Sequence, residues 1–467
     1  MDLLRFFKIN DLYRFFLLVL LFLGIKGFLF YFGTFVTTNE LKFFVVAKFF
    51  SQGKWLYKDI WETCEPLSAF VYYCLPSNFS YFSKIGFWLN FLLLCYSAFY
   101  FNSILQKHDV LSDKTFLPAF FFVFLALSAA QLSTCSAPLI ASVFLLYVLN
   151  KVLSYLKKEN VNEMYEAGFF LGIASLCYLP TALLAFALSF TMLLFSRSTI
   201  KAYLLLFSGL LFPWLILSVI YLWNSGTQDL FAILLGKYFF VGKSVFQWKE
   251  LAYCILPICL VFITGIFYSL RERAREINYQ NICRHFMMLW LLGNLFVFFS
   301  SPVRSLSDFH LFLPPLAYFF TYYYLQIKKT FVPNLIIIGS VIIMLFMQVR
   351  FLNQRMRQDN MGQWFISSTE SALSANGKRM WVIGSDYRSY IHSIPTMKYL
   401  NWEISKDDLN NLDHFTGTEN VRRNLEKVRP EWIVDQNNIV PSLFERIPKL
   451  KSQYILTDPK SFVYHLK

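Results

Sequence analysis

Charged residues are scarce in this chain. Asp, Glu, Lys and Arg make up 15% of its 467 residues, whereas a soluble globular domain carries roughly 25%. Hydrophobic residues make up 56% and include 54 Phe. They fall in runs of about 15–23 residues, long enough to cross roughly 30 Å of hydrocarbon as helices. The composition excludes an ordinary soluble protein and predicts a mostly α-helical, polytopic membrane protein.

Several motifs are also missing. The sequence has no CxxC pair, no G-x-G-x-x-G fingerprint, no nucleic-acid-binding motif and no internal repeat. Most of the eight cysteines lie in apolar runs, where Cys acts as a small hydrophobe. Cys64 and Cys74 share one loop, so a disulfide between them is a minor alternative. The net charge of +14 does not indicate nucleic acid, because the basic residues sit between apolar runs. We therefore predict membrane partners and no nucleic acid.

The apolar runs predict about eleven spans by length and hydropathy. The predicted spans are 14–32, 85–105, 115–131, 137–156, 167–179, 181–196, 202–223, 251–270, 286–300, 310–327 and 331–349. The fifth and sixth are short and flank Pro180, which predicts a broken hairpin. Arg5, Lys8 and Arg14 precede the first run without a cleavage site after it, as in an uncleaved signal anchor.

Basic residues predict the orientation. With the N-terminus inside, each inner connection holds at least two of them, as the positive-inside rule requires. These residues are Arg5, Lys8, Arg14, Lys107, Lys114, Lys157, Lys158, Arg197, Lys201, Arg271, Arg273, Arg275, Arg284, Lys328 and Lys329. We expect a multi-pass bacterial inner-membrane protein with a cytoplasmic N-terminus and a periplasmic C-terminal domain.

The orientation divides the chain into two predicted domains. Residues 1–350 form the transmembrane domain, with a large first outer loop at 33–84. Residues 351–467 form a small α/β domain, because short apolar runs alternate with helical patterns. The expected strands are 380–384, 431–435, 453–458 and 461–466, and the expected helices are 406–412 and 418–427. Packing and lid function is the simplest interpretation of this tail.

The first outer loop is acidic and aromatic, and it predicts two short helices flanking a turn at Gly53. Glu40 follows a span and is backed by aromatic residues, so desolvation would raise its pKa and suit it to acid–base work. The simpler interpretation is a helix start, in which Thr37, Thr38 or Asn39 caps and Glu40 occupies the first turn. Pro66 is expected to open the second helix.

Basic residues on the other outer loops depart from the positive-inside pattern. They are Lys237, Lys243 and Lys249 on 224–250, and Arg304 with His310 on the short loop before the tenth span. A lipid phosphate at the outer leaflet would explain them, since Arg binds phosphate with a fork of donors and Lys with a point charge. Interfacial snorkelling is the alternative for the lysines.

Four short motifs follow one another in the first loop: Asn39-Glu40, Gly53, Tyr57-Lys58-Asp59 and Glu65-Pro66-Leu67. Late in the chain, the segment 307–320 holds His310, Pro314 and Pro315. This pattern resembles the GT-C glycosyltransferases, in the branch of protein O-mannosyltransferases and lipid A aminoarabinose transferases. The resemblance in the order of segments covers nearly the whole chain, and the motifs that carry it are short.

The resemblance implies a polyprenyl-phosphate sugar donor and an acid that deprotonates the acceptor as the sugar leaves the phosphate. Glu40 and Asp59 are the expected catalytic residues. The expected substrate- and phosphate-binding residues are Asn39, Tyr57, Lys58, Glu65, Lys237, Lys243, Arg304 and His310. No cofactor is expected, metal dependence stays open, and the acceptor is a lipid, a glycan or a protein.

Two positions depart from the family pattern. Asn39 stands where the family has Asp, and an amide cannot act as a base at neutral pH. Cys64 stands where one family variant has Lys, which removes a phosphate contact. A non-catalytic GT-C-like scaffold in an envelope assembly is therefore the main alternative. A transporter is the third, although the spans lack the intramembrane charges typical of ion-coupled pathways, with Lys26 the main exception.

Overall fold

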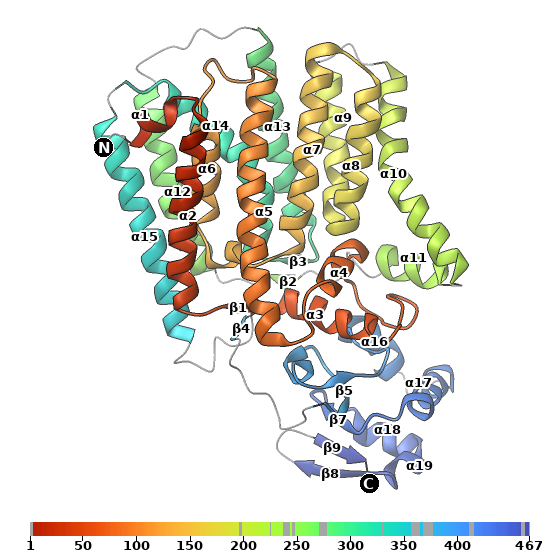
Figure 1. The fold of residues 1–467 in the computed structure, drawn as a ribbon. Helices are drawn as coiled ribbons and strands as arrows, with labels where there is room; N and C mark the ends of the chain where they lie inside the picture. Colours follow the sequence, from red (N-terminus) through yellow and green to blue (C-terminus); the bar gives the residue numbers. More distant parts are fainter. Residues whose placement is uncertain are drawn as a thin grey trace. The chain divides into compact units, whose positions relative to one another are not determined.

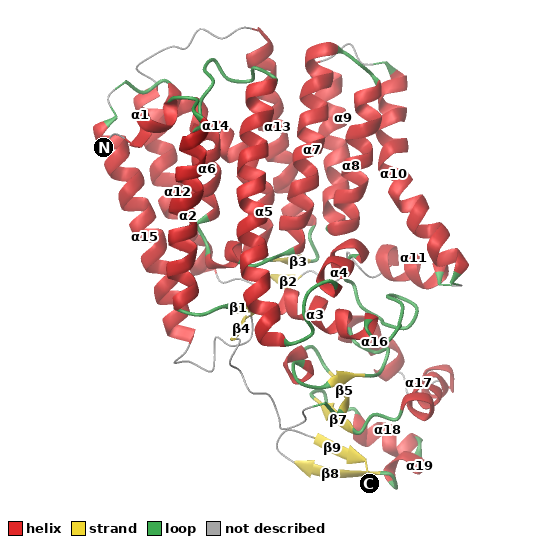
Figure 2. Cartoon of the chain, in the orientation of Figure 1, coloured by secondary structure: helices red, strands yellow, loops and turns green. Residues whose placement is uncertain are grey.

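The computed structural model describes residues 3–195, 199–224, 226–236, 243–244, 248–269, 278–328, 330–355, 365–367, 377–410, 415–458 and 463–466. These residues are mostly helical, with a few short strands (Figure 1; Figure 2). The chain forms two compact units. Unit 1 comprises Met1–Phe35, Lys84–Leu217 and Gly242–Trp364, and unit 2 comprises Val36–Ser83, Ser218–Val241 and Phe365–Lys467.

Unit 1 consists mainly of helices, and its longer helices run side by side (Figure 1). Its helices are α1 (Leu3–Lys8), α2 (Leu12–Tyr31), α5 (Phe79–Lys107), α6 (Leu117–Ala126), α7 (Ala137–Lys158), α8 (Asn162–Cys177), α9 (Leu184–Phe195), α10 (Ile200–Trp223), α12 (Trp248–Ser269), α13 (Asn278–Ser300), α14 (Leu313–Leu325) and α15 (Phe331–Arg355). The first residues of α5 and the last of α10 fall in unit 2. Three 3₁₀ helices join the long ones, η1 (Ala130–Ser133), η2 (Leu179–Leu183) and η4 (Leu306–Phe312).

Every predicted apolar segment overlaps a helix, although α6 covers only Leu117–Ala126 of the predicted span 115–131. Pro180 lies in η2 between α8 and α9, as expected. Within the described residues, six helices are long and apolar enough to cross a membrane: α2, α5, α7, α10, α13 and the Phe331–Arg350 part of α15. Shorter apolar helices cover Leu117–Ala126, Leu179–Phe195 and Ile255–Phe267. The chain is thus a multi-pass membrane protein, while the predicted number of eleven spans is not confirmed.

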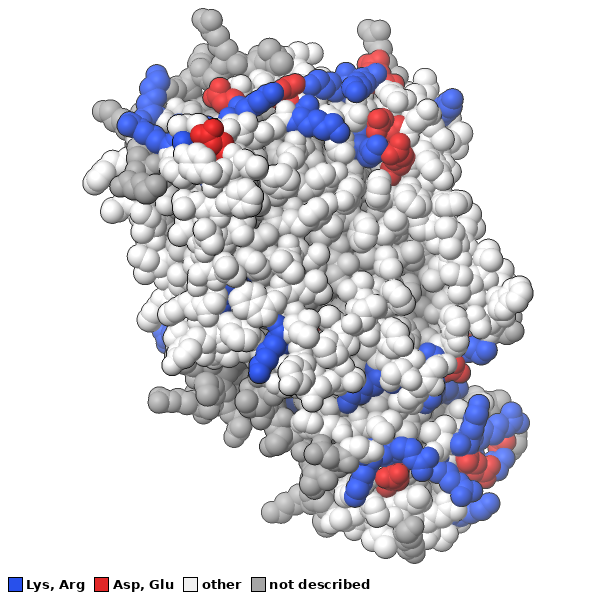
Figure 3. Space-filling view, in the orientation of Figure 1, with Lys and Arg blue, Asp and Glu red and all other residues white. Residues whose placement is uncertain are grey.

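The surface of the unit 1 helices carries a broad band almost free of Lys, Arg, Asp and Glu, with charged residues gathered at one end (Figure 3). Lys107 ends α5, and Lys157 and Lys158 end α7. Asp109 pairs with Lys157 at 2.7 Å and with Lys114 at 3.9 Å. These basic residues, which were predicted to lie on inner connections, are therefore found together at helix ends on the surface.

Helices α8 and α10 approach each other closely at glycines. A β-carbon at Gly168 would lie 2.0 Å from the carbonyl oxygen of Leu206, and one at Gly209 would lie 2.3 Å from that of Tyr165. Gly168 and Gly172 have the small-xxx-small spacing that lets membrane helices pack backbone to backbone. These contacts require glycine for space rather than for its conformational freedom.

Unit 2 combines the first loop with the tail. Its loop elements are β1 (Phe35–Thr37), α3 (Thr38–Phe50), α4 (Pro66–Tyr73) and α11 (Thr227–Gly236). Its tail elements are β4 (Phe365–Ser367), β5 (Arg379–Ile383), η5 (Tyr387–Tyr390), β6 (Ile394–Pro395), α16 (Trp402–Asn410), α17 (Phe415–Val428), β7 (Trp432–Asp435), α18 (Val440–Arg446), α19 (Pro448–Lys451), β8 (Tyr454–Asp458) and β9 (Val463–Leu466). The predicted boundary near residue 350 separates the tail in sequence, yet the compact unit also includes 36–83 and 218–241.

Five strands form the tail sheet in the order β6-β5-β7-β9-β8. Strand β5 pairs in parallel with β6 and β7, and β9 runs antiparallel to β7 and β8. The four predicted strands are therefore present, together with β6, which was not predicted. The hydrophobic core beside this sheet contains Trp381, Ile433, Val421, Leu425 and Leu443.

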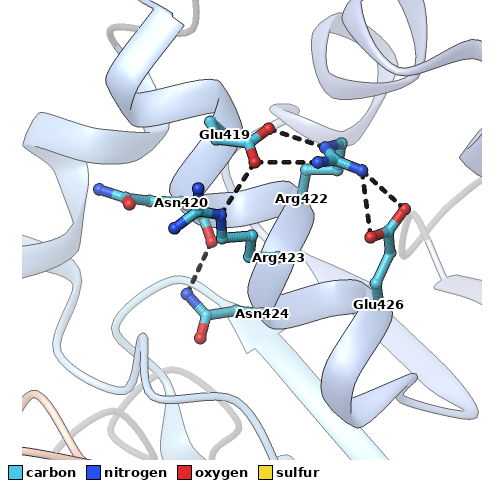
Figure 4. Close-up of polar contacts among 6 residues, drawn as sticks. All are labelled: Glu419, Asn420, Arg422, Arg423, Asn424 and Glu426. Carbon is cyan, nitrogen blue, oxygen red and sulfur yellow. Dashed lines mark hydrogen bonds and ion pairs between the residues drawn. The ribbon is translucent and has the colours of Figure 1, made fainter.

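Helix α17 confirms the predicted helix at 418–427 and extends it at both ends. Its polar face holds a ladder of ion pairs, in which Arg422 bonds Glu419 and Glu426, and Arg423 bonds Glu419 (Figure 4). The spacing of three and four residues suits neighbours on one helix face. Exposed pairs of this kind contribute little to stability, so we interpret this face as solvated.

Candidate functional site

Glu40 lies in the first turn of α3, where the simpler interpretation placed it. Thr37 is the N-cap, and its hydroxyl accepts from the Glu40 amide at 3.3 Å. Glu40 Oε2 accepts from the Thr37 amide at 2.9 Å, which completes a capping box. The Glu40 side chain is only 4% exposed, so the carboxylate is a buried helix-start group. Asn39 is half-buried in the same turn.

Tyr57, Lys58 and Asp59 form a tight turn beyond Gly53, which adopts the positive φ expected of a turn. Asp59 Oδ2 accepts from the Trp55 amide at 3.0 Å. Tyr57 is buried and donates its hydroxyl to the Cys64 carbonyl at 2.6 Å. Burial raises the pKa of Tyr57 well above its usual range, so this phenol is a neutral donor that shapes the turn.

Lys58 lies on the exposed side of that turn. Its ammonium donates to the Asn224 carbonyl at 2.6 Å, and the Tyr221 hydroxyl donates to the Leu56 carbonyl at 3.1 Å. The end of α10 is thus tied to the 56–58 turn within unit 2. Because one N–H of the Lys58 ammonium is bonded to the Asn224 carbonyl, fewer of its N–H groups are available to a phosphate.

Glu62 was not among the predicted site residues, yet both of its carboxylate oxygens accept hydrogen bonds. It is 0% exposed. Its Oε1 accepts from the Thr63 amide at 2.8 Å and from Asn401 Nδ2 at 2.7 Å, and its Oε2 accepts from the Tyr387 hydroxyl at 2.7 Å. The only sequence signal was its place in an acidic loop, because both tail partners lie more than 320 residues away.

Lys42 faces the same acidic region from α3. Burial opposes its charge most strongly, but the carboxylates of Glu62 and Glu65 outweigh burial and raise its pKa above the usual value. Glu65 is 5% exposed and precedes α4, which Pro66 opens as predicted. Cys64 and Cys74 are free thiols, and burial raises the pKa of Cys64 well above its usual range. This part of unit 2 therefore combines buried carboxylates with one ammonium.

The tail holds the first loop through further hydrogen bonds. Lys48 donates to the carbonyls of Tyr390 and Ile391, each at 2.8 Å, and to that of Ser393 at 3.1 Å. The Trp61 amide donates to the Lys398 carbonyl at 2.8 Å. The tail is thus part of the same unit as the acidic loop, rather than a separate appendage.

Arg304 lies in unit 1, on strand β3 (Val303–Arg304). This strand pairs in parallel with β2 (Lys243–Ser244), so Lys243 is opposite Val303 and Ser244 is opposite Arg304. Two of the predicted phosphate-binding positions therefore lie on neighbouring strands. Arg304 Nε is buried and has no hydrogen-bond acceptor among the described residues. Lys237 lies outside the described residues.

His310 lies in η4, the turn that leads into α14, and is 0% exposed. Its Nδ1 is 2.7 Å from the Ser307 carbonyl and 3.3 Å from Ser136 Oγ. Burial lowers the pKa of His310 to about 4, so the ring is neutral at pH 7. His310 was predicted to lie at the phosphate, and this stays a prediction for a ring that the structure places in the protein interior, away from solvent.

The predicted residues thus form two groups. Asn39, Glu40, Tyr57, Lys58, Asp59 and Glu65 belong to unit 2, while Lys243, Arg304 and His310 belong to unit 1. Among the described residues, no three His, Cys, Asp or Glu side chains are placed to hold a metal ion together. The site chemistry that the chain itself offers is that of carboxylates, ammonium groups and a guanidinium.

Comparisons with known proteins give no family for this chain. No protein-family model matches the chain, and no curated protein matches it by sequence. Among solved structures, it is similar to the crystal structure of ArnT from Cupriavidus metallidurans bound to undecaprenyl phosphate. The TM-score is 0.44 at 15% identity, over 68% of this chain and 61% of that one. The chain therefore spans less than two thirds of that protein, and a likeness at this level assigns no activity.

Proposed function

We propose that this protein is a membrane glycosyltransferase, which moves a sugar from a polyprenyl-phosphate-linked donor to an acceptor at the periplasmic face of the inner membrane. The observation that carries the proposal is the β2–β3 pair. It brings Lys243 and Arg304, from loops about sixty positions apart in sequence, onto neighbouring strands. Arg304 follows the membrane-length helix α13 by a few residues, so its guanidinium lies close to a membrane surface.

A guanidinium with a buried Nε that has no acceptor among the described residues suits a phosphate oxygen. In the proposed reaction, the acceptor oxygen bonds to the anomeric carbon of the sugar as the bond from that carbon to the phosphate oxygen breaks. A carboxylate of the first loop takes the acceptor proton. The released polyprenyl phosphate gains negative charge, which Arg304 and Lys243 stabilise electrostatically.

Glu40 and Asp59 remain the proposed bases, with Asn39, Tyr57, Lys58 and Glu65 around the sugar and Lys237 beside the phosphate. The test is transfer from a polyprenyl-phosphate sugar by purified protein in vesicles, with an extract of envelope lipids and glycans as acceptor. Glu40→Gln and Asp59→Asn should each lower transfer, and the surface variant Glu426→Gln should not. Full transfer by both loop variants would refute the assignment of the base.

A specific observation favours the second candidate, a non-catalytic scaffold. Glu40 and Asp59 each direct one carboxylate oxygen to a local backbone amide, at Thr37 and Trp55. Each bond uses one carboxylate oxygen to hold the start of a helix or a turn, which is a structural role. A partner that co-purifies at constant stoichiometry from native membranes, together with no transfer by the wild type, would favour the scaffold.

A further inference from the structure

The connection between α6 and α7 is an unusual part of unit 1. Residues 128–136 are all buried, and apart from η1 they are not helical. Backbone groups beside membrane helices need partners from within the protein, because hydrocarbon offers none. The partner of two of these carbonyls is a single side chain. Asn90 Nδ2 donates to the Leu132 carbonyl at 2.9 Å and to the Thr134 carbonyl at 2.7 Å.

Lys26 fixes the orientation of that amide. Its Nζ, in the second half of α2, donates to Asn90 Oδ1 at 2.9 Å, and both residues are 0% exposed. An Asn side chain can turn over and exchange its oxygen with its nitrogen. A donor held against Oδ1 opposes the exchange, so Nδ2 stays directed at the two carbonyls. Lys26 also lies 4.6 Å from the Phe87 ring centre, and no carboxylate pairs with it among the described residues.

The other end of this connection leads to Arg304. Ser136 ends the buried segment and caps α7, and its Oγ is 3.3 Å from His310 Nδ1. His310 Nδ1 is in turn 2.7 Å from the Ser307 carbonyl, and the Ser307 and Ser305 hydroxyls bond each other. Ser305 directly follows Arg304. Buried polar contacts, linked by short stretches of backbone, therefore join Lys26 to the turn that carries Arg304.

We propose that Lys26 is a positioning residue, which holds the 128–136 segment through Asn90 and thereby sets the turn that presents Arg304. The role in phosphate binding rests on the proposed function, whereas the mechanical coupling does not. His310 and Ser136 are intermediate members of the same series. Without the Lys26 donor, Asn90 loses its fixed orientation, and its Nδ2 no longer holds the Leu132 and Thr134 carbonyls. The turn that carries Arg304 then becomes more mobile.

The first experiment measures backbone hydrogen exchange by mass spectrometry on the full-length protein in nanodiscs. Lys26→Met keeps the length of the side chain and removes its donors. It should speed exchange in peptides covering 130–136 and 303–310, and leave the tail peptide 432–444 unchanged. Lys26→Gln, which keeps a neutral donor for Asn90 Oδ1, should exchange like the wild type at both places.

Unchanged exchange at 303–310 in a folded Lys26→Met variant would overturn the inference. If that variant does not fold, Ser136→Ala breaks the series at a later contact and should speed exchange at 303–310. If residues 303–310 of Ser136→Ala exchange at the wild-type rate, the inference is also overturned.

The second experiment measures the affinity for a polyprenyl monophosphate. One buried hydrogen bond corresponds to about a tenfold change in affinity. We therefore expect Lys26→Met to bind the polyprenyl monophosphate about tenfold more weakly than the wild type. In an Arg304→Gln background the same change should cause no further loss, because Lys26 acts through Arg304. Equal losses in both backgrounds would contradict that route. A wild type that does not bind the lipid at all would refute the proposed function, while the exchange experiment still decides the inference.

Discussion

The Tyr387 hydroxyl donates a 2.7 Å hydrogen bond to Glu62 Oε2, across 325 positions of sequence. The bond joins the tail domain to the acidic first loop inside unit 2. Burial, assisted by the negative charge of Glu62, raises the pKa of Tyr387 well above its usual range. The phenol therefore stays protonated and remains a donor, which a fully buried carboxylate requires.

Tyr387→Phe should lower the stability of unit 2 by about 1–3 kcal/mol, because it leaves a buried carboxylate short of one donor. Thermal unfolding of the detergent-solubilised protein, followed by circular dichroism, measures the change. Tyr464→Phe is the matched control, since the Tyr464 hydroxyl is in the same unit and has no hydrogen bond among the described residues. Equal effects of the two substitutions would show that the Glu62 bond is not stabilising.

Lys48→Met should release the tail turn at 390–393 from the first loop. Three carbonyls lose their shared donor, so we expect the free energy of unfolding of unit 2 to fall by about 2 kcal/mol. The loss is smaller than three separate hydrogen bonds would give, because the substitution also removes a half-buried charge. Limited proteolysis should then cleave near residue 390 faster. Lys406→Met removes a partly exposed ammonium that pairs with Glu403 and should leave the cleavage rate within about twofold of the wild-type rate.

Gly168→Ala should disrupt the packing of α8 on α10. Its new methyl group would lie 2.0 Å from the Leu206 carbonyl oxygen, a distance that forces the two helices apart. Gly24→Ala in α2 is the control, because nothing lies within 4 Å of a β-carbon there. We expect a lower melting temperature and a lower yield for the α8 variant alone. A normal melting temperature for Gly168→Ala would contradict this close approach.

Unit 1 should lose stability in acid because of His310. Its pKa is about 4 in the folded protein and about 6.5 when unfolded. The unfolded state therefore binds the proton first, and stability falls as the pH drops from about 6.5 towards 4, by a total on the order of 3 kcal/mol. His310→Asn keeps an amide donor near the Ser307 carbonyl and does not titrate. Its melting temperature should therefore change less than that of the wild type between pH 7 and 4.5.

The apolar runs predicted the helices of unit 1 well, because a span must be long and nearly uncharged to reside in a membrane. Local signals also worked. Thr37, Gly53 and Pro66 start or end elements as expected, through capping, a positive φ and a fixed φ. The four expected tail strands are present because each is a short apolar run bounded by polar residues. These features depend on neighbours in sequence.

The surroundings of individual side chains depend on distant partners. Glu62 was not predicted as a site residue, because Tyr387 and Asn401, which donate to it, lie far away in sequence and leave no local pattern. His310 was expected at a phosphate because its loop is short and opens directly into a span, and its complete burial beside Ser136 is a property of packing. Lys26 stood out in the sequence only as a charge within an apolar run, and its contact with Asn90 is likewise a property of packing.

The account depends most on Arg304 as the binding group for a lipid phosphate. The direct measurement is the equilibrium affinity of the purified protein in nanodiscs for a polyprenyl monophosphate, compared for wild type, Arg304→Gln and the exposed control Arg379→Gln. We predict saturable binding by wild type and Arg379→Gln, and an affinity about tenfold to a hundredfold lower for Arg304→Gln, the scale of a charge-assisted hydrogen bond. No binding by the wild type, or equal affinity for all three proteins, would contradict the account.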